Sequence, residues 1–247
     1  MNKKSKADLN AALERDPAAR SKWEVFFTYP GFKALYKYRK AHWFYTHGMK
    51  FIASIISKRA RRKTGVEIHP GATIGEGVFI DHGSGVVIGE TAEIGNNVTI
   101  YQGVTLGGTG KDTGKRHPTI EDDVMISAGA KVLGPFTVGK GSKIGAGSVV
   151  LKEVPPYSTV VGVPGRIVKM HDKKVSENLD QVKSPDPILC EIKRLNRRIE
   201  TLETMLDVKS CKYSIVNAEG GVIEPECQNI TTDRIDEEIY NGEDNND

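Results

Sequence analysis

Cysteine and long apolar stretches are both scarce in this sequence of 247 residues. Its three cysteines include no C-x-x-C pair, which excludes a disulfide framework and a cysteine-based zinc finger and suits a reducing cytoplasm. No apolar run approaches the ~20 residues that a helix needs to cross a bilayer. The polar residues 1–6 are followed by no apolar segment of the kind that signal peptides carry. We therefore expect a cytoplasmic protein that is neither secreted nor inserted in a membrane.

Charge, aromatic residues and glycine are spread unevenly, and they divide the chain into three regions. Residues 1–65 carry 16 Lys and Arg against 4 Asp and Glu, and 11 of the 17 aromatic residues lie there. Residues 66–171 are nearly neutral, and 21 of the 26 glycines lie between Gly65 and Gly165. Residues 172–247 carry 10 basic against 18 acidic residues and all three cysteines. We predict three segments with the boundaries 1–64, 65–171 and 172–247.

The middle segment repeats an aliphatic residue every six positions. A period of six fits neither the 3.6-residue period of a helix nor the alternation of an ordinary strand. It is typical of a parallel β-helix, in which each hexad supplies one short strand and one turn, with the aliphatic side chain pointing inward. A β-sandwich with regular turns is the alternative, and it explains the period less well. The repeated positions are Ile68, Ile74, Ile80, Ile88, Ile94, Ile100, Leu106, Ile120, Ile126, Val132, Val138, Ile144 and Val150.

The repeat is interrupted twice, and both interruptions carry chemically useful side chains. One step, of eight residues instead of six, contains Asp81 and His82. The other, of fourteen residues, is a Gly-rich segment that ends in Arg116 and His117. Departures from a regular pattern are candidates for function. Histidine can accept a proton at neutral pH, a carboxylate can orient its ring, and arginine can bind a carboxylate. We therefore predict the active site at these interruptions.

The hexads and their two interruptions resemble the left-handed β-helix of the hexapeptide-repeat acyltransferases. Within that superfamily, the stretch from about Asp16 to Arg166 is similar to serine O-acetyltransferases. The resemblance implies a mainly β fold, a left-handed parallel β-helix behind an N-terminal α-helical cap. It implies an enzyme of cysteine biosynthesis that moves acetyl from acetyl-CoA directly to the hydroxyl of L-serine, without a metal. It also implies a homotrimer, with active sites between neighbouring prisms, and leaves a hexamer open.

Matched residue by residue, the resemblance implies roles for six residues at and around the interruptions. His82 would be the general base and Glu67 its carboxylate partner, although the family usually has Asp at the position of Glu67. Asp81 and another carboxylate would bind the ammonium group of the substrate. The remaining residues implied by the match are Asp16, which would share that ammonium, Arg116, which would bind the substrate carboxylate, and His117, which would line the pocket near the reacting groups.

The resemblance also implies where acetyl-CoA lies. Its pantetheine arm would run against small residues that let an extended ligand approach the backbone. These are Gly108, Thr109, Ala128, Gly129 and Ala146. Lys143 and Arg166 would contact the nucleotide end, and Arg166 could equally cap the β-helix.

Four other hypotheses compete with this one. Zinc-binding β-helices need a second histidine near the first, and none follows His82 closely. The segment from Gly107 to Lys111 lacks the first glycine of a phosphate-binding loop. Acetylation of another hydroxyl, in homoserine or a sugar, remains an alternative, but a sugar has no use for two carboxylates and an arginine together. A non-catalytic β-helix scaffold is the alternative outside enzymes.

The flanking segments give weaker predictions. Residues 6–63 are expected to form helices broken at Pro17, at Pro30 and near Gly48. The basic run 58–63 could suit nucleic acid or an anionic membrane, but no nucleic-acid motif accompanies it, so we expect a solvated helix end and neither partner. Beyond the repeat, aliphatic residues follow a heptad seam that predicts a coiled coil over about 187–207. The seam consists of Ile188, Ile192, Leu195, Ile199, Leu202 and Leu206.

The last segment leaves the partners open. The acidic stretch beyond Gly220 is expected to be disordered. Many serine O-acetyltransferases end in an isoleucine that enters the active site of O-acetylserine sulfhydrylase, whereas this sequence ends in Asp247. The resemblance therefore leaves that partnership uncertain. Feedback inhibition by L-cysteine is implied by the resemblance alone.

Overall fold

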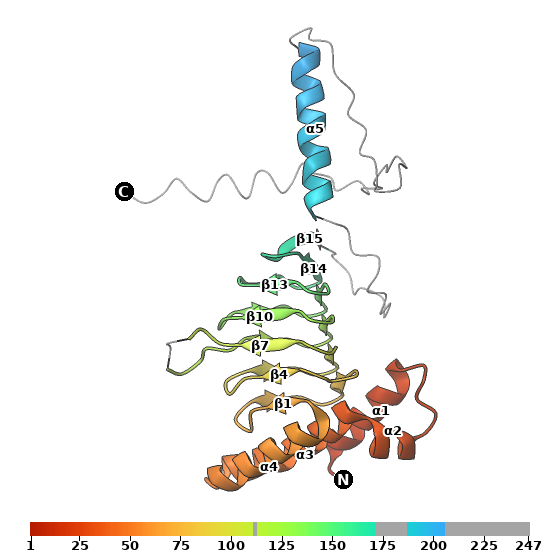
Figure 1. The fold of residues 1–247 in the computed structure, drawn as a ribbon, viewed down its shortest axis with the longest axis vertical. Coiled ribbons are helices and arrows are strands. Elements are labelled where there is room, and N and C mark those ends of the chain that lie inside the picture. The colour runs from red at the N-terminus through yellow and green to blue at the C-terminus, as the bar shows by residue number, and fades with distance from the viewer. Residues whose placement is uncertain (111–112, 171–186, 206–247) are drawn as a thin grey trace. The chain divides into compact units, whose positions relative to one another are not determined.

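The computed structural model describes residues 1–110, 113–170 and 187–205 (Figure 1). The chain forms two units, Met1–Ser184 and Pro185–Asp247. The described part of the first unit contains helices α1–α4 and strands β1–β15, and the described part of the second is the helix α5 (Pro187–Met205). The predicted acidic tail and Leu206, the last residue of the predicted seam, lie outside the described residues.

The strands wind through three faces in turn, so that a strand pairs with the one three places further along the chain from β1 to β13 (Figure 1). Sheet A consists of β1 (Glu67–Ile68), β4 (Val87–Ile88), β7 (Thr105–Gly107), β10 (Lys131–Leu133) and β13 (Val149–Val150). Sheet B consists of β2 (Thr73–Ile74), β5 (Glu93–Ile94), β8 (Thr119–Ile120) and β11 (Thr137–Val138). Sheet C consists of β3 (Phe79–Ile80), β6 (Thr99–Ile100), β9 (Met125–Ile126), β12 (Lys143–Ile144), β14 (Ser158–Val161) and β15 (Arg166–Met170). The pairs are parallel except β14 with β15, which are antiparallel and end the coil.

The aliphatic residue of every hexad lies inside the coil. All thirteen predicted positions are buried, and none exposes more than 5% of its surface. Each such burial stabilises the fold by about 1.5–3 kcal/mol. The interruptions leave the stack in register, because Ile68 pairs with Ile88, Ile88 with Leu106, and Leu106 with Val132. The extra residues therefore leave the coil at its corners, and the predicted parallel β-helix is confirmed.

Four helices form the N-terminal cap: α1 (Lys3–Arg15), α2 (Lys22–Thr28), α3 (Pro30–Thr46) and α4 (Lys50–Thr64). Proline at the first position of α3 suits a helix start, because the missing N–H would have no partner there. Gly65 ends α4 with a φ of 71°, the left-handed conformation that glycine adopts freely. Gly31 of α3 is needed for close approach, since a Cβ there would collide with the Ile80 carbonyl of β3. The helices predicted for this segment are thus present, packed against the coil.

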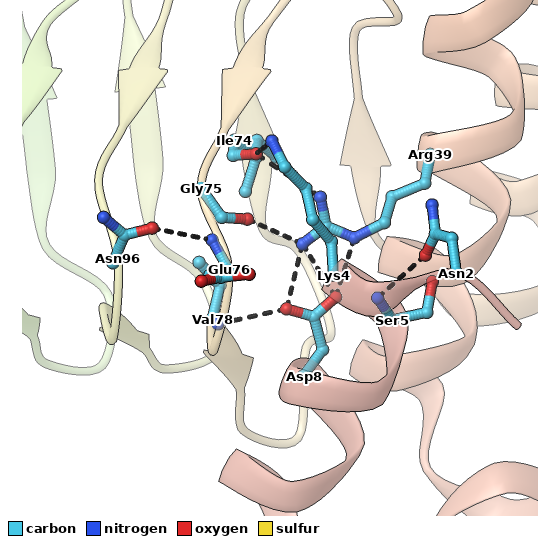
Figure 2. Close-up of polar contacts among 10 residues, drawn as sticks. All are labelled: Asn2, Lys4, Ser5, Asp8, Arg39, Ile74, Gly75, Glu76, Val78 and Asn96. Atoms are coloured by element: carbon cyan, nitrogen blue, oxygen red, sulfur yellow. Dashed lines mark hydrogen bonds and ion pairs between the residues drawn. The ribbon is translucent and has the colours of Figure 1, made fainter.

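A buried ion pair fastens the cap to the coil (Figure 2). Asp8 of α1 accepts hydrogen bonds from Arg39 of α3 at 2.8 Å (Nε to Oδ2) and 2.9 Å (Nη2 to Oδ1). The Val78 N–H also donates to Asp8, at 3.2 Å, and Arg39 donates to the Gly75 carbonyl at 2.7 Å. Burial raises the pKa of Asp8, and Arg39 opposes that shift. Since a buried charge needs its partner, the pair holds α1 against the turn between β2 and β3.

Candidate active site

The first interruption of the repeat lies between β3 and β4, where sheet C passes to sheet A. Asp81 follows β3 directly, and its N–H donates to the Ile100 carbonyl at 2.8 Å, which ties it to the end of β6. His82 comes next with a φ of 55°, an uncommon conformation outside glycine that is often found at functional sites. Its side chain is 74% exposed, and its Nε2 lies 4.0 Å from Asp81 Oδ2. The strand therefore fixes the carboxylate, while the imidazole faces solvent.

Asp16 reaches the same corner from the cap. It ends α1, and its Oδ2 accepts a hydrogen bond of 2.6 Å from the Tyr29 hydroxyl. Burial raises the pKa of Asp81; His82 opposes this shift, and the negative charge of Asp16 adds to it. Two carboxylates that repel each other favour a cation between them. Asp16 lies near enough to Asp81 for their charges to interact, and Asp81 lies beside His82, so these surroundings suit an ammonium group.

Glu67 is occupied elsewhere. Its Oε2 lies 3.1 Å from Nη1 of Arg61, in the last turn of α4. In the described part of the chain no hydrogen bond or ion pair joins Glu67 to His82. Both partners of the Arg61 pair are substantially exposed, so the pair contributes little stability. The pairing of Glu67 with His82 stays a prediction.

The second interruption lies between β7 and β8, where sheet A passes to sheet B. Nη2 of Arg116 lies 3.6 Å from Glu90 Oε2, and the Tyr45 hydroxyl donates to Glu90 Oε1 at 3.0 Å. His117 is 7% exposed, and its Nδ1 lies 2.8 Å from the Thr91 hydroxyl. Burial, followed by the nearby Arg116 charge, lowers the pKa of His117, so its ring is neutral near pH 7. This corner holds its side chains by hydrogen bonds, in contrast to the exposed His82.

The two interruptions therefore occupy different corners of one coil. Within the described residues, no hydrogen bond or ion pair joins the Asp16, Asp81 and His82 group to Arg116 or His117. The candidate residues of a single chain thus form two separate groups, which we call half-sites.

The residues predicted to bind acetyl-CoA divide in the same way. Gly108 and Thr109 directly follow β7, at the corner of His117. Ala128 and Gly129 follow β9, and Ala146 follows β12, at the corner of His82. Lys143 and Arg166 lie in strands of sheet C, in β12 and β15.

Backbone hydrogen bonds stack the small residues of the His82 corner into one column. The Gly103 N–H donates to the Ser84 carbonyl at 2.8 Å, Gly129 to Gln102 at 2.8 Å, and Gly147 to Ala128 at 2.9 Å. The column of Ser84, Gln102, Ala128 and Ala146, in which all but Gln102 are small, therefore starts two residues after His82 and runs up the predicted acetyl-CoA face. A chain of small residues at a corner leaves the backbone open to an extended ligand.

Neither a metal-binding cluster nor a membrane-spanning helix is present among the described residues. Across residues 1–110, 113–170 and 187–205, no group of three His, Cys, Asp or Glu side chains is arranged to hold a metal ion. In the same ranges, no helix is both long and apolar enough to span a bilayer. A hollow of about 510 Å³ lies over sheet B, lined by polar residues that include Glu93, Glu121 and Lys140. It contains no predicted site residue, and it is open and polar, so the half-sites are the better candidates for chemistry.

Comparison with known proteins identifies the family. The family model for bacterial transferase hexapeptide (six repeats) matches residues 117–152. A serine acetyltransferase of Bacillus pumilus (strain SAFR-032) is 60% identical over 198 residues, which cover 80% of this chain and 91% of that protein. The chain belongs to the serine acetyltransferase family. The left-handed β-helix implied by the resemblance fits that family.

Solved serine acetyltransferases share the fold. One, in complex with cysteine, superposes with a TM-score of 0.69 at 44% identity, over 72% of this chain and 69% of that chain. Another, from Brucella abortus strain S19 in complex with coenzyme A, superposes with a TM-score of 0.66 at 47% identity, over 68% and 67% of the two chains. The two half-sites can therefore be interpreted by comparison with serine acetyltransferases.

Several residues that hold the half-sites were missed by the sequence analysis. Tyr29, Glu90 and Thr91 contact predicted residues directly, and Tyr45 acts through Glu90. Glu90 and Thr91 lie in an unbroken hexad, so a search confined to the interruptions passes over them. Gln102 also lies in an unbroken hexad, and its Oε1 is buried without a partner among the described residues. Glu90 and Thr91 are a polar pair that directly follows the hexad glycine Gly89. A polar pair in such a position, opposite an interruption, is the sequence signal that could have identified them.

Proposed function

We propose that the chain transfers the acetyl group of acetyl-CoA to the hydroxyl of L-serine, giving O-acetyl-L-serine and CoA. Identity of 60% to a serine acetyltransferase supports the reaction. The acceptor is supported by one observation above all, the two carboxylates of Asp16 and Asp81 beside the exposed His82. An amino acid offers an ammonium group to the carboxylates and a hydroxyl to the imidazole. A sugar offers no such cation.

His82 acts as the general base in the proposed mechanism. Its imidazole takes the hydroxyl proton as the serine oxygen attacks the thioester carbonyl and forms the new C–O bond. The C–S bond then breaks, and the departing CoA sulfur takes the proton from the imidazolium. Transfer is direct, and the absence of cysteine from residues 66–171 is consistent with that. Glu67 is proposed to orient the His82 ring, which requires its carboxylate to leave Arg61.

A complete site takes its two halves from neighbouring chains. The predicted amino-acid and acetyl-CoA residues are both divided between two corners of one coil, and two copies side by side can bring unlike corners together. Arg116 of one chain would then bind the carboxylate of a serine whose ammonium lies at Asp16 and Asp81 of the next. We propose a homotrimer, in which every chain gives one half-site to one neighbour and receives the other half-site from the second neighbour. A hexamer built from two trimers stays open.

Acetyl-CoA is proposed to lie along the column of small residues. Ala128, Gly129 and Ala146 flank the pantetheine on the His82 side, and Gly108 with Thr109 closes it from the other half-site. Lys143 and Arg166 project from sheet C, where their positive charges suit the phosphates of the nucleotide end.

L-cysteine is proposed as an inhibitor at the amino-acid site. It carries the same ammonium and carboxylate as serine, and the cysteine complex of a related serine acetyltransferase supports the idea. The reaction is assigned to the cytoplasm. A complex with O-acetylserine sulfhydrylase is not proposed, because the segment that would make it lies outside the described residues.

The helix α5 is proposed to associate with α5 of another copy. Four of its predicted seam residues expose between 38% and 56% of their surface. Isoleucine and leucine alternate among these four residues, which is the arrangement of parallel coiled coils. The four residues are Ile192, Leu195, Ile199 and Leu202.

The acceptor is tested by measuring thiol release from acetyl-CoA with L-serine, L-homoserine and a hexose at equal concentrations. We expect release with serine to exceed release with the other two by at least about tenfold, because only serine fits both the cation site and the base. Equal rates with serine and the hexose would contradict the proposal. No thiol release with any of the three acceptors would favour the scaffold alternative.

A further inference from the structure

Thr91 makes four contacts with Arg116 and His117, at the end of the long interruption. Its Oγ1 accepts the backbone N–H of Arg116 at 3.1 Å and that of His117 at 3.2 Å. Its own N–H donates to His117 Nδ1 at 3.2 Å, and its Oγ1 lies 2.8 Å from the same nitrogen. A single residue of an unbroken hexad thus contacts both the backbone and the ring at the end of the long interruption.

These contacts determine where the protons lie. The Thr91 backbone N–H can only donate, so His117 Nδ1 must accept and carries no proton. The Thr91 hydroxyl already accepts two backbone N–H groups, so its own proton is free to point at Nδ1 as well. Two donors on Nδ1 require the proton of the neutral ring to be on Nε2. The lowered pKa of His117 agrees with a neutral ring.

The other side of the ring faces glycine backbone. A Cβ on Gly89 would overlap the His117 ring, and a Cβ on Gly108 would lie 3.2 Å from its Nε2. In the part of the chain that the structure describes, Nε2 has no hydrogen-bond partner. His117 Nε2 therefore lies between Gly89 and Gly108, the second of which is one of the positions proposed for the acetyl-CoA arm, and no described residue accepts its proton.

We propose that Thr91 is a positioning residue that locks His117 in the neutral Nε2–H tautomer, so that the ring offers a hydrogen-bond donor to the reacting groups. The identity of the group that accepts the Nε2–H hydrogen bond rests on the proposed function, whereas the tautomer of His117 does not. With Nδ1 occupied and Nε2 protonated, His117 cannot serve as the base. Its donor stabilises negative charge that develops on oxygen during acetyl transfer.

The tautomer is tested directly by ¹⁵N NMR of the histidine rings in the full-length wild-type protein, with His117→Gln used to assign the signals. We expect Nδ1 to resonate as an unprotonated nitrogen and Nε2 as a protonated one near neutral pH. A protonated Nδ1 would overturn the proposal. This measurement needs neither substrate nor activity, so its failure is distinct from failure of the proposed function.

Thr91→Val and Thr91→Ser test the role in catalysis. Valine keeps the shape and backbone N–H but removes the hydroxyl, so we expect kcat to fall about ten- to a hundredfold with little change in KM for serine. Serine restores the hydroxyl and should restore kcat. Thr137→Val is the matched control, because the Thr137 hydroxyl makes no hydrogen bond to any described residue.

The variants can also contradict the inference. If Thr91→Val leaves kcat and the ¹⁵N signals of His117 unchanged, Thr91 does not position the ring. If Thr91→Ser loses as much kcat as Thr91→Val, the hydroxyl is not the group that matters, and the inference is likewise overturned.

Discussion

The two corners of the coil each hold one histidine, in opposite surroundings. His82 is 74% exposed and lies beside the Asp81 carboxylate. His117 is 7% exposed, and Thr91 occupies its Nδ1. An exposed imidazole next to a carboxylate can take up and release a proton, whereas a buried neutral ring with one nitrogen occupied can only donate a hydrogen bond. Surroundings, and not residue type, therefore separate the proposed base from the proposed donor.

The largest expected effect tests the base. His82→Ala should lower kcat by about a thousandfold, because general base catalysis contributes on that scale. His117→Ala should cost less, about ten- to a hundredfold, as expected for one lost donor. His47→Ala, at the exposed end of α3, is the control and should change nothing. Steady-state rates with serine measure all three, and an equal loss at His82 and His117 would remove the division of labour between the corners.

The next prediction concerns the sharing of a site between chains. Arg116→Ala should raise KM for serine about a hundredfold, through loss of a two-pronged contact to its carboxylate. Mixed oligomers of His82→Ala chains with Arg116→Ala chains, isolated by two different tags, should be more active than either parent. In such an oligomer, the intact His82 of an Arg116→Ala chain lies across an interface from the intact Arg116 of a His82→Ala chain. Mixed oligomers no more active than the parents would show that the corners do not combine between chains.

Glu67→Asp should have a smaller effect, with kcat within about threefold of the wild type. The shorter side chain loses Arg61, and that exposed pair adds little to stability. The resemblance also puts aspartate at this position in most relatives. A collapse of kcat at unchanged melting temperature would mean that the base requires the longer Glu67 side chain.

The smallest effect is on stability as a function of pH. Burial lowers the pKa of His117 and of His69 below the ordinary 6.5. Near pH 6 the unfolded chain therefore binds more protons than the folded chain. The contribution of these histidines to the free energy of unfolding is present above pH 6.5 and is lost as the pH falls. Urea midpoints at pH 7.5 and 5.5 should differ less for His117→Gln than for the wild type. The charged residues that face His117 include Arg116, Lys115 and Glu90. If the urea midpoint changes by the same amount between the two pH values in His117→Gln and in the wild type, His117 is not the cause.

Most of the fold could be predicted from the period of the repeat. Every hexad residue from Ile68 to Val150 is buried, because the aliphatic side chain of each strand points into the core of the coil. Successive hexads pass through the three faces in turn. The number of hexads between the two interruptions therefore already predicts that the interruptions lie at different corners. The buried pair of Asp8 and Arg39 could not be predicted, since it joins two helices and a turn that have no common periodicity.

The residue types of the candidate site were predictable, but their supports were not. Asp81 and His82 stand out because they break a pattern. Thr91 does not break it, and its contact with His117 spans 26 residues and depends on how the long interruption folds back. The pairing of Glu67 with Arg61 likewise depends on where the last turn of α4 ends.

The unbroken register across both interruptions has a consequence for how such enzymes diversify. The coil closes in the same way whether six, eight or fourteen residues separate successive aliphatic side chains. Corners are therefore insertion points whose length and chemistry can change without altering the stack. New acceptor specificities can arise by exchanging corner segments alone, and a designer can graft such segments onto a bare repeat with the same freedom.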